Sequence, residues 1–158
     1  ATMMPRQLSK GVVDGAGAVL LASAAYVKRR GLKPRARVLA VPNMGDCATL
    51  MLNAPVPATR KVLAKAGLSI DDIDLFEINE AFAVVAMAAQ KDLGIPREKL
   101  NVNGGACALG HPIGATGARL IVTLLHALEA QNLKRGVAAL CIGGGEATAI
   151  AIERVVRR

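Results

Sequence analysis

The sequence predicts an α/β protein in which strands and helices alternate around one sheet. Short apolar runs bounded by Gly and Pro alternate with longer segments whose apolar residues recur at helical spacing. From residue 36 onward the order is β-α-β-α-β-α-β-β, which favours an open, mostly parallel sheet with helices on both faces. The tight turn at residues 143–145 makes the last two strands antiparallel.

The first elements predicted are a strand, a helix and a second strand. Residues 16–23 are small and apolar and predict a buried strand, which runs into a helix capped by Ser23 and ended near Gly31. Residues 36–41 predict the next strand, and a long loop is expected over residues 42–55. The strand at 16–23 has no partner among the later elements, so we expect it to belong to an upstream unit.

The middle of the chain predicts two helices separated by a strand. Residues 56–67 are amphipathic, with Val62 and Leu63 on the apolar face and a glycine at the end. Residues 73–78 predict a strand. Residues 79–93 predict a helix whose first two turns are apolar on nearly all sides, which indicates burial on several faces.

The remaining elements complete the sheet. Residues 100–103 predict a short strand, and the glycine-rich segment 104–117 opens a helix that continues to about residue 133. Residues 136–142 and 147–155 predict the last two strands. The prediction is therefore a five-stranded sheet.

Composition argues against several classes of function. The 158 residues are 53% hydrophobic but only 2% aromatic, which argues against a stacking platform for single-stranded nucleic acid. No apolar run reaches the roughly 18 residues that a membrane span needs. Six of the ten residues 28–37 are Lys or Arg in a chain of net charge +8. A solvated helix end is the favoured interpretation and a phosphate-binding patch the alternative, since no nucleic-acid-binding motif accompanies them.

Reactive side chains stand at the ends of the predicted elements, where open α/β sheets bind ligands. Asn79 follows a strand, His111 lies in the glycine-rich loop, and Cys141 ends a strand before three glycines beginning at Gly143. Each has a structural interpretation, as a helix cap, a buried imidazole or a small apolar side chain. Together they suggest acid–base or covalent chemistry on a carbonyl group. Cys107 and His111 have no matching second pair, so we expect no metal site.

Three motifs resemble those of the thiolases. NEAFA at 79–83, GGACALGHPIGATG at 104–117 and CIGGG at 141–145 occur in the family's order and spacing, and the likeness extends from about residue 11 to residue 155. Thiolases have two similar domains and about two and a half times this length. The resemblance implies a thiolase-like fold in which residues 36–158 are the C-terminal domain with a mixed five-stranded sheet. Residues 1–35 would then be the tail of the N-terminal domain, a leftover strand and helix.

The resemblance also implies an activity and a set of site residues. Thiolases are acyl-CoA C-acyltransferases that cleave 3-ketoacyl-CoA with CoA or run the reverse Claisen condensation. By motif, His111 would be the base that activates a nucleophilic cysteine, and Cys141 would be the second acid/base. Asn79 would hold a water that completes an oxyanion hole with His111. The N–H of Gly143 would serve the other oxyanion hole, and Ser9 and Phe82 would contact CoA.

The chain departs from the family in its nucleophile. Nothing in it matches the family's nucleophilic cysteine, and neither Cys47 nor Cys107 is a credible substitute. We therefore expect the chain alone to be inactive. Lys10 stands where the family usually has a serine that contacts the pantetheine arm, and Ser9 takes that role if the register slips by one residue.

The partners and location follow from the same resemblance. Acyl-CoA and CoA are expected as substrates, with no permanently bound cofactor, and the full-length protein is expected to be a dimer or tetramer. An N-terminal thiolase half is the expected protein partner. The three cysteines, which show no disulfide spacing, favour a reducing compartment, the cytoplasm, with mitochondria and peroxisomes left open. The alternative is a non-catalytic thiolase-like subunit that binds CoA or stabilises a partner.

Overall fold

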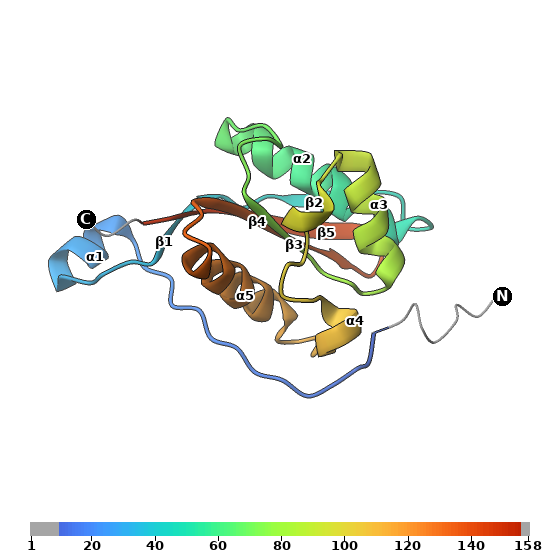
Figure 1. Ribbon diagram of the computed structural model, residues 1–158, viewed down its shortest axis with the longest axis horizontal. Coiled ribbons are helices and arrows are strands. Elements are labelled where there is room, and N and C mark those ends of the chain that lie inside the picture. Colours follow the sequence, from blue (N-terminus) through green and yellow to red (C-terminus); the bar gives the residue numbers. More distant parts are fainter. Residues whose placement is uncertain (1–9, 156–158) are drawn as a thin grey trace.

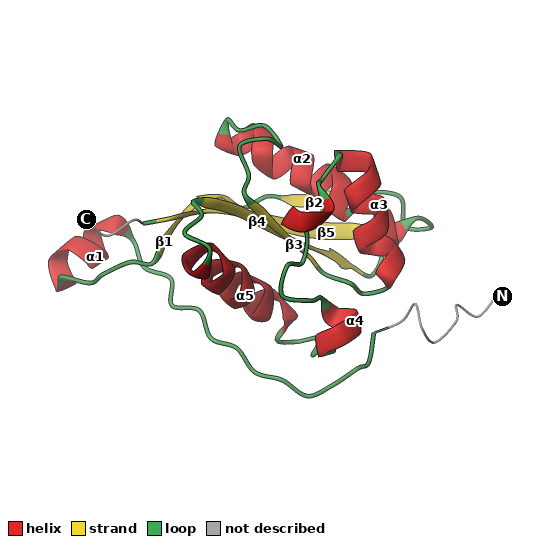
Figure 2. Ribbon diagram, viewed as in Figure 1, coloured by secondary structure: helices red, strands yellow, loops and turns green. Residues whose placement is uncertain are grey.

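The computed structural model describes residues 10–155 and contains one sheet between two layers of helices. Helices α2 and α3 cover one face of the sheet and α5 covers the other (Figures 1 and 2). The predicted α/β fold with a mixed five-stranded sheet is confirmed. The elements are α1 Ala24–Arg30, β1 Ala36–Ala40, β2 Asn43–Gly45, a 3-10 turn Met51–Asn53, α2 Pro55–Ala66, β3 Leu75–Ile78, α3 Ala83–Leu93, a 3-10 turn Arg97–Lys99, α4 Ala106–Leu109, α5 Thr116–Ala130, β4 Arg135–Ile142 and β5 Glu146–Arg154.

The sheet is more antiparallel than the sequence predicts. Its order is β1-β5-β4-β3, with β2 also paired to β5. Strands β4 and β5 form the expected hairpin, with Ile142 opposite Glu146 at its turn. Both β1 and β2 run antiparallel to β5, so among the strands of residues 10–155 only β3 and β4 pair in parallel. The expectation of a mostly parallel sheet is wrong because β5 reverses direction and then takes β1 and β2 along its outer edge.

Two predicted strands are absent from the described residues. Residues 16–23 run as an extended, exposed segment beside α5 (Figure 1), with no ladder partner, and Leu20 is 87% exposed. Residues 100–103 form a turn in which Leu100 makes one isolated bridge to Phe76, because the chain bends away at Asn101, whose φ is 48°. The fifth strand is instead β2, which lies within the segment predicted to be a loop.

Helix ends follow the local chemistry of the sequence at α1 and α2. Ser23 Oγ accepts the N–H of Tyr26 at 3.2 Å, and α1 ends at Gly31 with φ 61°. Pro55 opens α2, and Gly67 ends it with φ 67°. These are the residue types that satisfy or tolerate the unpaired backbone groups of helix termini.

Helix α3 begins four residues later than predicted. Its first residue is Ala83, and Phe82 precedes it without a side-chain cap, so Asn79 does not cap the helix. The helix is also not buried on several sides within this chain, since Met87 is 62% exposed. The residues between β3 and α3 are therefore available for contacts other than capping.

The core divides into two clusters, one on each side of the sheet. Phe76 and Ile78 of β3 pack into the cluster beneath α2 and α3, whereas Leu75 packs into the cluster beneath α5. Side chains of a strand alternate between faces. Glu77 and Asn79 therefore lie on the α5 side of the sheet, which positions the site described below.

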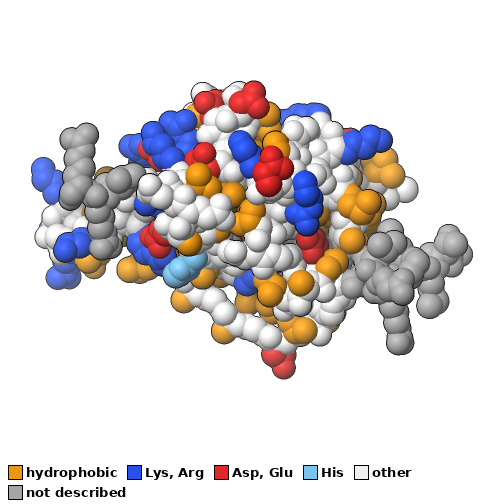
Figure 3. Space-filling model, in the orientation of Figure 1, with side chains coloured by type: hydrophobic (Ala, Val, Ile, Leu, Met, Phe, Trp, Pro, Cys, Tyr) orange, Lys and Arg blue, Asp and Glu red, His pale blue; other side chains and the backbone are white. Residues whose placement is uncertain are grey.

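The surface carries mixed charge with scattered apolar side chains. One face shows Lys and Arg gathered around α1 and over α2, and hydrophobic side chains along the extended segment below (Figure 3). No helix in the described part of the chain has the length and apolar character to cross a membrane.

Candidate active site

His111 lies between α4 and α5 and makes one hydrogen bond to the N-terminal segment and one to the first turn of α5. Its backbone N–H donates to Gly11 O at 2.9 Å, and its Nδ1 lies 2.5 Å from Thr116 Oγ1. The Thr116 hydroxyl donates its single proton to Pro112 O at 2.9 Å. Thr116 must therefore accept from Nδ1–H, which leaves Nε2 of the neutral imidazole as the unprotonated nitrogen.

Asn79 brings a buried carboxamide to the same nitrogen. Its backbone N–H continues the sheet by donating to Ala139 O at 2.9 Å, and the residue is only 1% exposed. Its Nδ2 lies 3.4 Å from Nε2 of His111. Arg119 Nη2 donates to Asn79 Oδ1 at 3.3 Å. The structure thus brings together Asn79 and His111, which are 32 positions apart in the sequence.

Electrostatics favour a neutral imidazole at this position. Burial lowers the pKa of His111, and the cations Lys10 and Arg119 lower it further. Burial raises the pKa of the Cys141 thiol, against a lowering effect of Lys10. The charge of Lys10 thus lowers the pKa of both His111 and Cys141. These shifts favour a neutral imidazole at His111 and a protonated thiol at Cys141.

Cys141 and Gly143 lie where β4 ends. Cys141 pairs with Ala147 of β5 and is half-buried, and Gly143 is exposed in the turn that follows. The turn is fixed by Gly145, whose φ is 87° and whose carbonyl accepts the N–H of Asp46 at 2.7 Å. A Cβ on Gly145 would lie 2.6 Å from Asp46 O, so this close approach requires glycine.

The two candidate CoA contacts differ in what the structure shows. Ser9 lies outside the described residues. Phe82 is partly buried, and the Lys10 ammonium lies 5.1 Å from the centroid of its ring. Phe82 and Cys141 both pack against the edge of the same core cluster. Lys10 therefore lies beside the Phe82 ring and also affects the pKa of His111 and Cys141.

A family model described as "Thiolase, C-terminal domain" matches residues 32–154. The chain belongs to the thiolase family. It is 51% identical over 153 residues to the mouse protein "Acetyl-CoA acetyltransferase, cytosolic", covering 97% of this chain and 38% of that protein. It is 51% identical over 147 residues to the "Acetyl-CoA acetyltransferase" of Escherichia coli K12, covering 93% of this chain and 37% of that one.

Solved thiolase structures share this fold closely. Human mitochondrial 3-ketoacyl-CoA thiolase superposes with a TM-score of 0.94 at 42% identity, over 97% of this chain and 39% of that one. A structure of the same human thiolase in complex with CoA superposes with a TM-score of 0.93 at 43% identity, over 96% of this chain and 38% of that one. The chain spans well under half the length of the thiolases it matches.

The structure adds a buried charged pair to the thiolase motifs. Glu77 is 1% exposed, and its Oε2 lies 3.9 Å from Nη1 of Arg119. Burial raises the pKa of Glu77 to about 7, with Arg119 opposing and Glu80 adding to the rise. Sequence reasoning did not single out this pair. A charge in the middle of an apolar strand, and an arginine in the first turn of a largely apolar helix, were the available signals.

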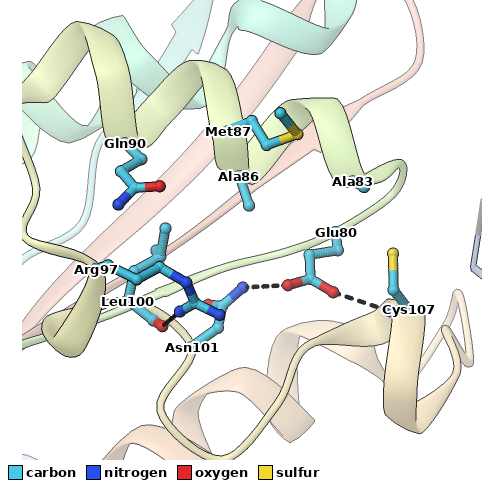
Figure 4. A pocket seen from close by; sticks show the side chains of 9 residues that line it. All are labelled: Glu80, Ala83, Ala86, Met87, Gln90, Arg97, Leu100, Asn101 and Cys107. Carbon is cyan, nitrogen blue, oxygen red and sulfur yellow. Dashed lines mark hydrogen bonds between the residues drawn. The ribbon is translucent and has the colours of Figure 1, made fainter. Parts of the chain in front are cut away.

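Glu80 of the NEAFA motif braces the loop that carries His111. Its carboxylate accepts Asn101 Nδ2 at 2.8 Å and the Cys107 N–H at 2.9 Å (Figure 4). A Cβ on Gly105 would lie 2.1 Å from the Glu80 carboxyl carbon, so glycine makes room for this contact. The shallow pocket of about 180 Å³ drawn there is lined by none of Asn79, His111 or Cys141.

The other two cysteines are exposed; Cys47 lies outside the three motifs, whereas Cys107 lies within the motif at 104–117. Hydrogen bonds to the backbone at Leu50 and Thr49 lower the pKa of Cys47, whereas burial and Glu80 raise the pKa of Cys107. Because Cys107 is exposed, it does not pack in the core, although alanines flank it. Among residues 10–155 no three His, Cys, Asp or Glu side chains gather as metal ligands would.

Proposed function

We propose that this chain is the carboxyl-terminal acid/base part of a thiolase-type acyl-CoA C-acyltransferase. The observation that carries the proposal is the pairing of His111 Nε2 with the Asn79 carboxamide. A neutral imidazole base and an amide N–H donor then lie next to each other. A thioester enolate or tetrahedral intermediate needs this combination, because negative charge develops on an oxygen while a proton is moved.

His111 acts first as the base in this proposal. Its unprotonated Nε2 takes the thiol proton of a nucleophilic cysteine carried outside these 158 residues, and the resulting thiolate attacks the substrate carbonyl. Its pKa, lowered by burial and by Lys10 and Arg119, keeps it unprotonated at neutral pH. Once protonated, it joins the water held by Asn79 in donating to the substrate oxygen.

Cys141 moves the second proton. Its raised pKa keeps the thiol protonated until substrate arrives, so in cleavage it donates its proton to the leaving α-carbon. In condensation it first gives that proton to the departing CoA thiolate, and the resulting Cys141 thiolate then takes the proton from the α-carbon. The open backbone at Gly143 is the candidate donor for the second oxyanion hole.

CoA esters are the proposed substrates. Thiolases from human mitochondria and from Ascaris suum have been crystallised with CoA, at 43% and 46% identity to this chain. Phe82 and Ser9 are the proposed contacts for the pantetheine arm. We further propose that residues 1–35 complete an N-terminal domain, that the whole protein is a dimer or tetramer, and that it acts in the cytoplasm, as the name of the mouse relative states for that protein.

The test is thiolysis of acetoacetyl-CoA by the chain alone and by the chain co-produced with the N-terminal half of the E. coli relative. We expect activity only in the complex, and its loss in the complex carrying His111→Ala. Thiolysis by the chain alone would overturn the assignment of the nucleophile, and Cys47→Ser and Cys107→Ser would then identify the substitute. A complex that binds CoA without thiolysis would establish the alternative, a non-catalytic binding or partner-stabilising subunit.

A further inference from the structure

The first turn of α5 contacts both residues of the proposed oxyanion site. Thr116 and Arg119 lie three positions apart and therefore on the same side of the helix. Thr116 holds Nδ1 of His111, and Arg119 donates to Oδ1 of Asn79. A single helical turn thus fixes the imidazole through one residue and the carboxamide through the other.

Arg119 is itself placed by a buried carboxylate. Glu77 of β3 and Asn79, which directly follows the strand, lie two positions apart and project to the α5 side of the sheet, where Arg119 contacts both. Within the described residues, the Glu77 carboxylate oxygens make no hydrogen bond, and neither do Nε and Nη1 of Arg119. Buried polar atoms are normally paired. The attraction between Glu77 and Arg119 is therefore one of charge across 3.9 Å, and it holds the guanidinium over Asn79.

The chemistry of the guanidinium decides which end of the carboxamide faces His111. Arg has five N–H donors and no acceptor, so only the oxygen of Asn79 can face it. The NH2 group is then left on the opposite side, toward Nε2 of His111. We propose that Arg119, held in place by its charge interaction with Glu77, is a positioning residue that selects this orientation of the Asn79 carboxamide.

This inference rests on the proposed function, and it predicts that the orientation of the Asn79 carboxamide depends on Arg119. Without Arg119 the carboxamide of Asn79 is free to turn by about 180° about its terminal torsion, since that torsion has a broad two-fold preference. The oxygen would then face the unprotonated Nε2 of His111, and neither group could donate to substrate. Arg119 touches no reacting atom. It also lowers the pKa of His111, so kcat is compared on the pH plateau, where His111 is unprotonated and Arg119 acts through Asn79.

A double-mutant cycle in the complex with the N-terminal half tests this dependence. Arg119→Met is expected to lower kcat for acetoacetyl-CoA thiolysis about 10- to 100-fold, the usual size for residues that orient a functional group, with KM changed less than about twofold. In the Asn79→Ala background the same substitution is expected to change kcat by less than about twofold. Equal losses in both backgrounds would overturn the proposal, because a structural defect would act in both.

Two further variants distinguish the positioning effect of Arg119 from the effect of its charge and from a loss of folding. Arg119→Lys keeps the cation and is expected to retain an intermediate kcat, because an ammonium lacks the planar fork that meets Glu77 and Asn79 together. Arg97→Met is the matched control. Arg97 is exposed and donates to Leu100 O on the other side of the sheet, so its variant is expected to keep the wild-type kcat. If Arg119→Met does not fold, the Arg119→Lys cycle with Asn79→Ala makes the same test.

A second measurement does not depend on activity. In the complex labelled with ¹⁵N-asparagine, the Asn79 side-chain NH2 is expected to give one slowly exchanging pair of signals, which shift and exchange faster in Arg119→Met. Unchanged signals would overturn the positioning role even where kcat falls. A wild-type complex without thiolase activity whose Asn79 signals still respond to Arg119 would refute the proposed function and leave this inference standing.

Discussion

Thr116 accepts a hydrogen bond from Nδ1 of His111 because its own proton is committed to the carbonyl of Pro112. The direction of two hydrogen bonds therefore determines which imidazole nitrogen is basic. Nε2, the nitrogen that faces Asn79, is the one left unprotonated. The tautomer of the candidate base is thus built into the start of a helix.

Replacing Thr116 removes this control of the tautomer. Thr116→Val has the same shape but no acceptor, so the Nδ1–H of His111 loses its partner and the other tautomer becomes accessible. We expect kcat of the complex to fall about 10- to 100-fold. The ¹⁵N shifts of the two His111 nitrogens measure the tautomer directly, and an unchanged shift pattern would contradict the role given to Thr116. Thr123→Val, later in α5, is the control.

Lys10 is expected to set the pH at which the site becomes active. It lowers the pKa of His111, which must be unprotonated to act as a base. Lys10→Ser removes that cation, so the pKa of His111 rises and the acid limb of kcat/KM moves to higher pH. The measurement is the pH profile of acetoacetyl-CoA thiolysis by the complex, with Lys91→Ser on α3 as the control. A limb that stays in place or moves to lower pH would contradict this expectation.

Glu77 is expected to make the fold less stable as pH rises. Its pKa is raised from 4.5 to about 7 by burial, with Glu80 and Arg119 as its charged neighbours. Between those values the folded state binds a proton that the unfolded state has released, so the free energy of unfolding falls as pH rises through this window. The full loss is about 3 kcal/mol, at about 1.4 kcal/mol for each pKa unit.

Glu77→Gln is neutral at every pH and is expected to lack this loss. Urea unfolding at pH 5 and pH 8 measures the free energy of unfolding. The variant should be more stable than wild type at pH 8 only. Glu98→Gln on the surface is the control. An equal effect of Glu77→Gln at both pH values would show that Glu77 does not change its protonation in this range.

Gly105 is expected to tolerate no side chain. A Cβ there would overlap the Glu80 carboxylate, which would have to leave both Asn101 and the Cys107 N–H. Gly105→Ala should cost about 1–3 kcal/mol of unfolding free energy, as overpacked core substitutions do. Gly114→Ala has open space around the new Cβ and is the matched control. Equal melting temperatures for the two variants would contradict the stabilising role given to the Glu80 carboxylate.

Local chemistry allowed much of the fold to be predicted. Ser23 and Gly31 bound α1 as expected, Gly67 ends α2, and the glycines after Cys141 make the β4–β5 hairpin. Each of these residues acts on the backbone within a few positions of itself. Its effect on a helix end or turn therefore does not depend on how the rest of the chain packs. The thiolase motifs added the placement of His111 beside Asn79, which no local pattern contains.

Long-range packing accounts for what was missed. Residues 16–23 carry a strand pattern, yet they have no edge to join within the described chain and stay exposed. Strand β2 is too short to show a pattern and exists because β5 offers it a partner. The contact of Glu77 with Arg119 joins a strand to a helix 42 positions later (119 − 77), and only the assembled sheet brings these charges together.

The pairing of β1 with β5 has a consequence for the order of folding. Ala36 lies opposite Arg154, so this pairing closes a loop of well over one hundred residues, a slow and entropically costly step. Asn79, His111, Arg119 and Cys141 all lie inside that loop, on elements joined by shorter connections. We therefore expect the acid/base cluster to assemble before the outer edge of the sheet closes, and to survive transient opening of that edge in the folded protein.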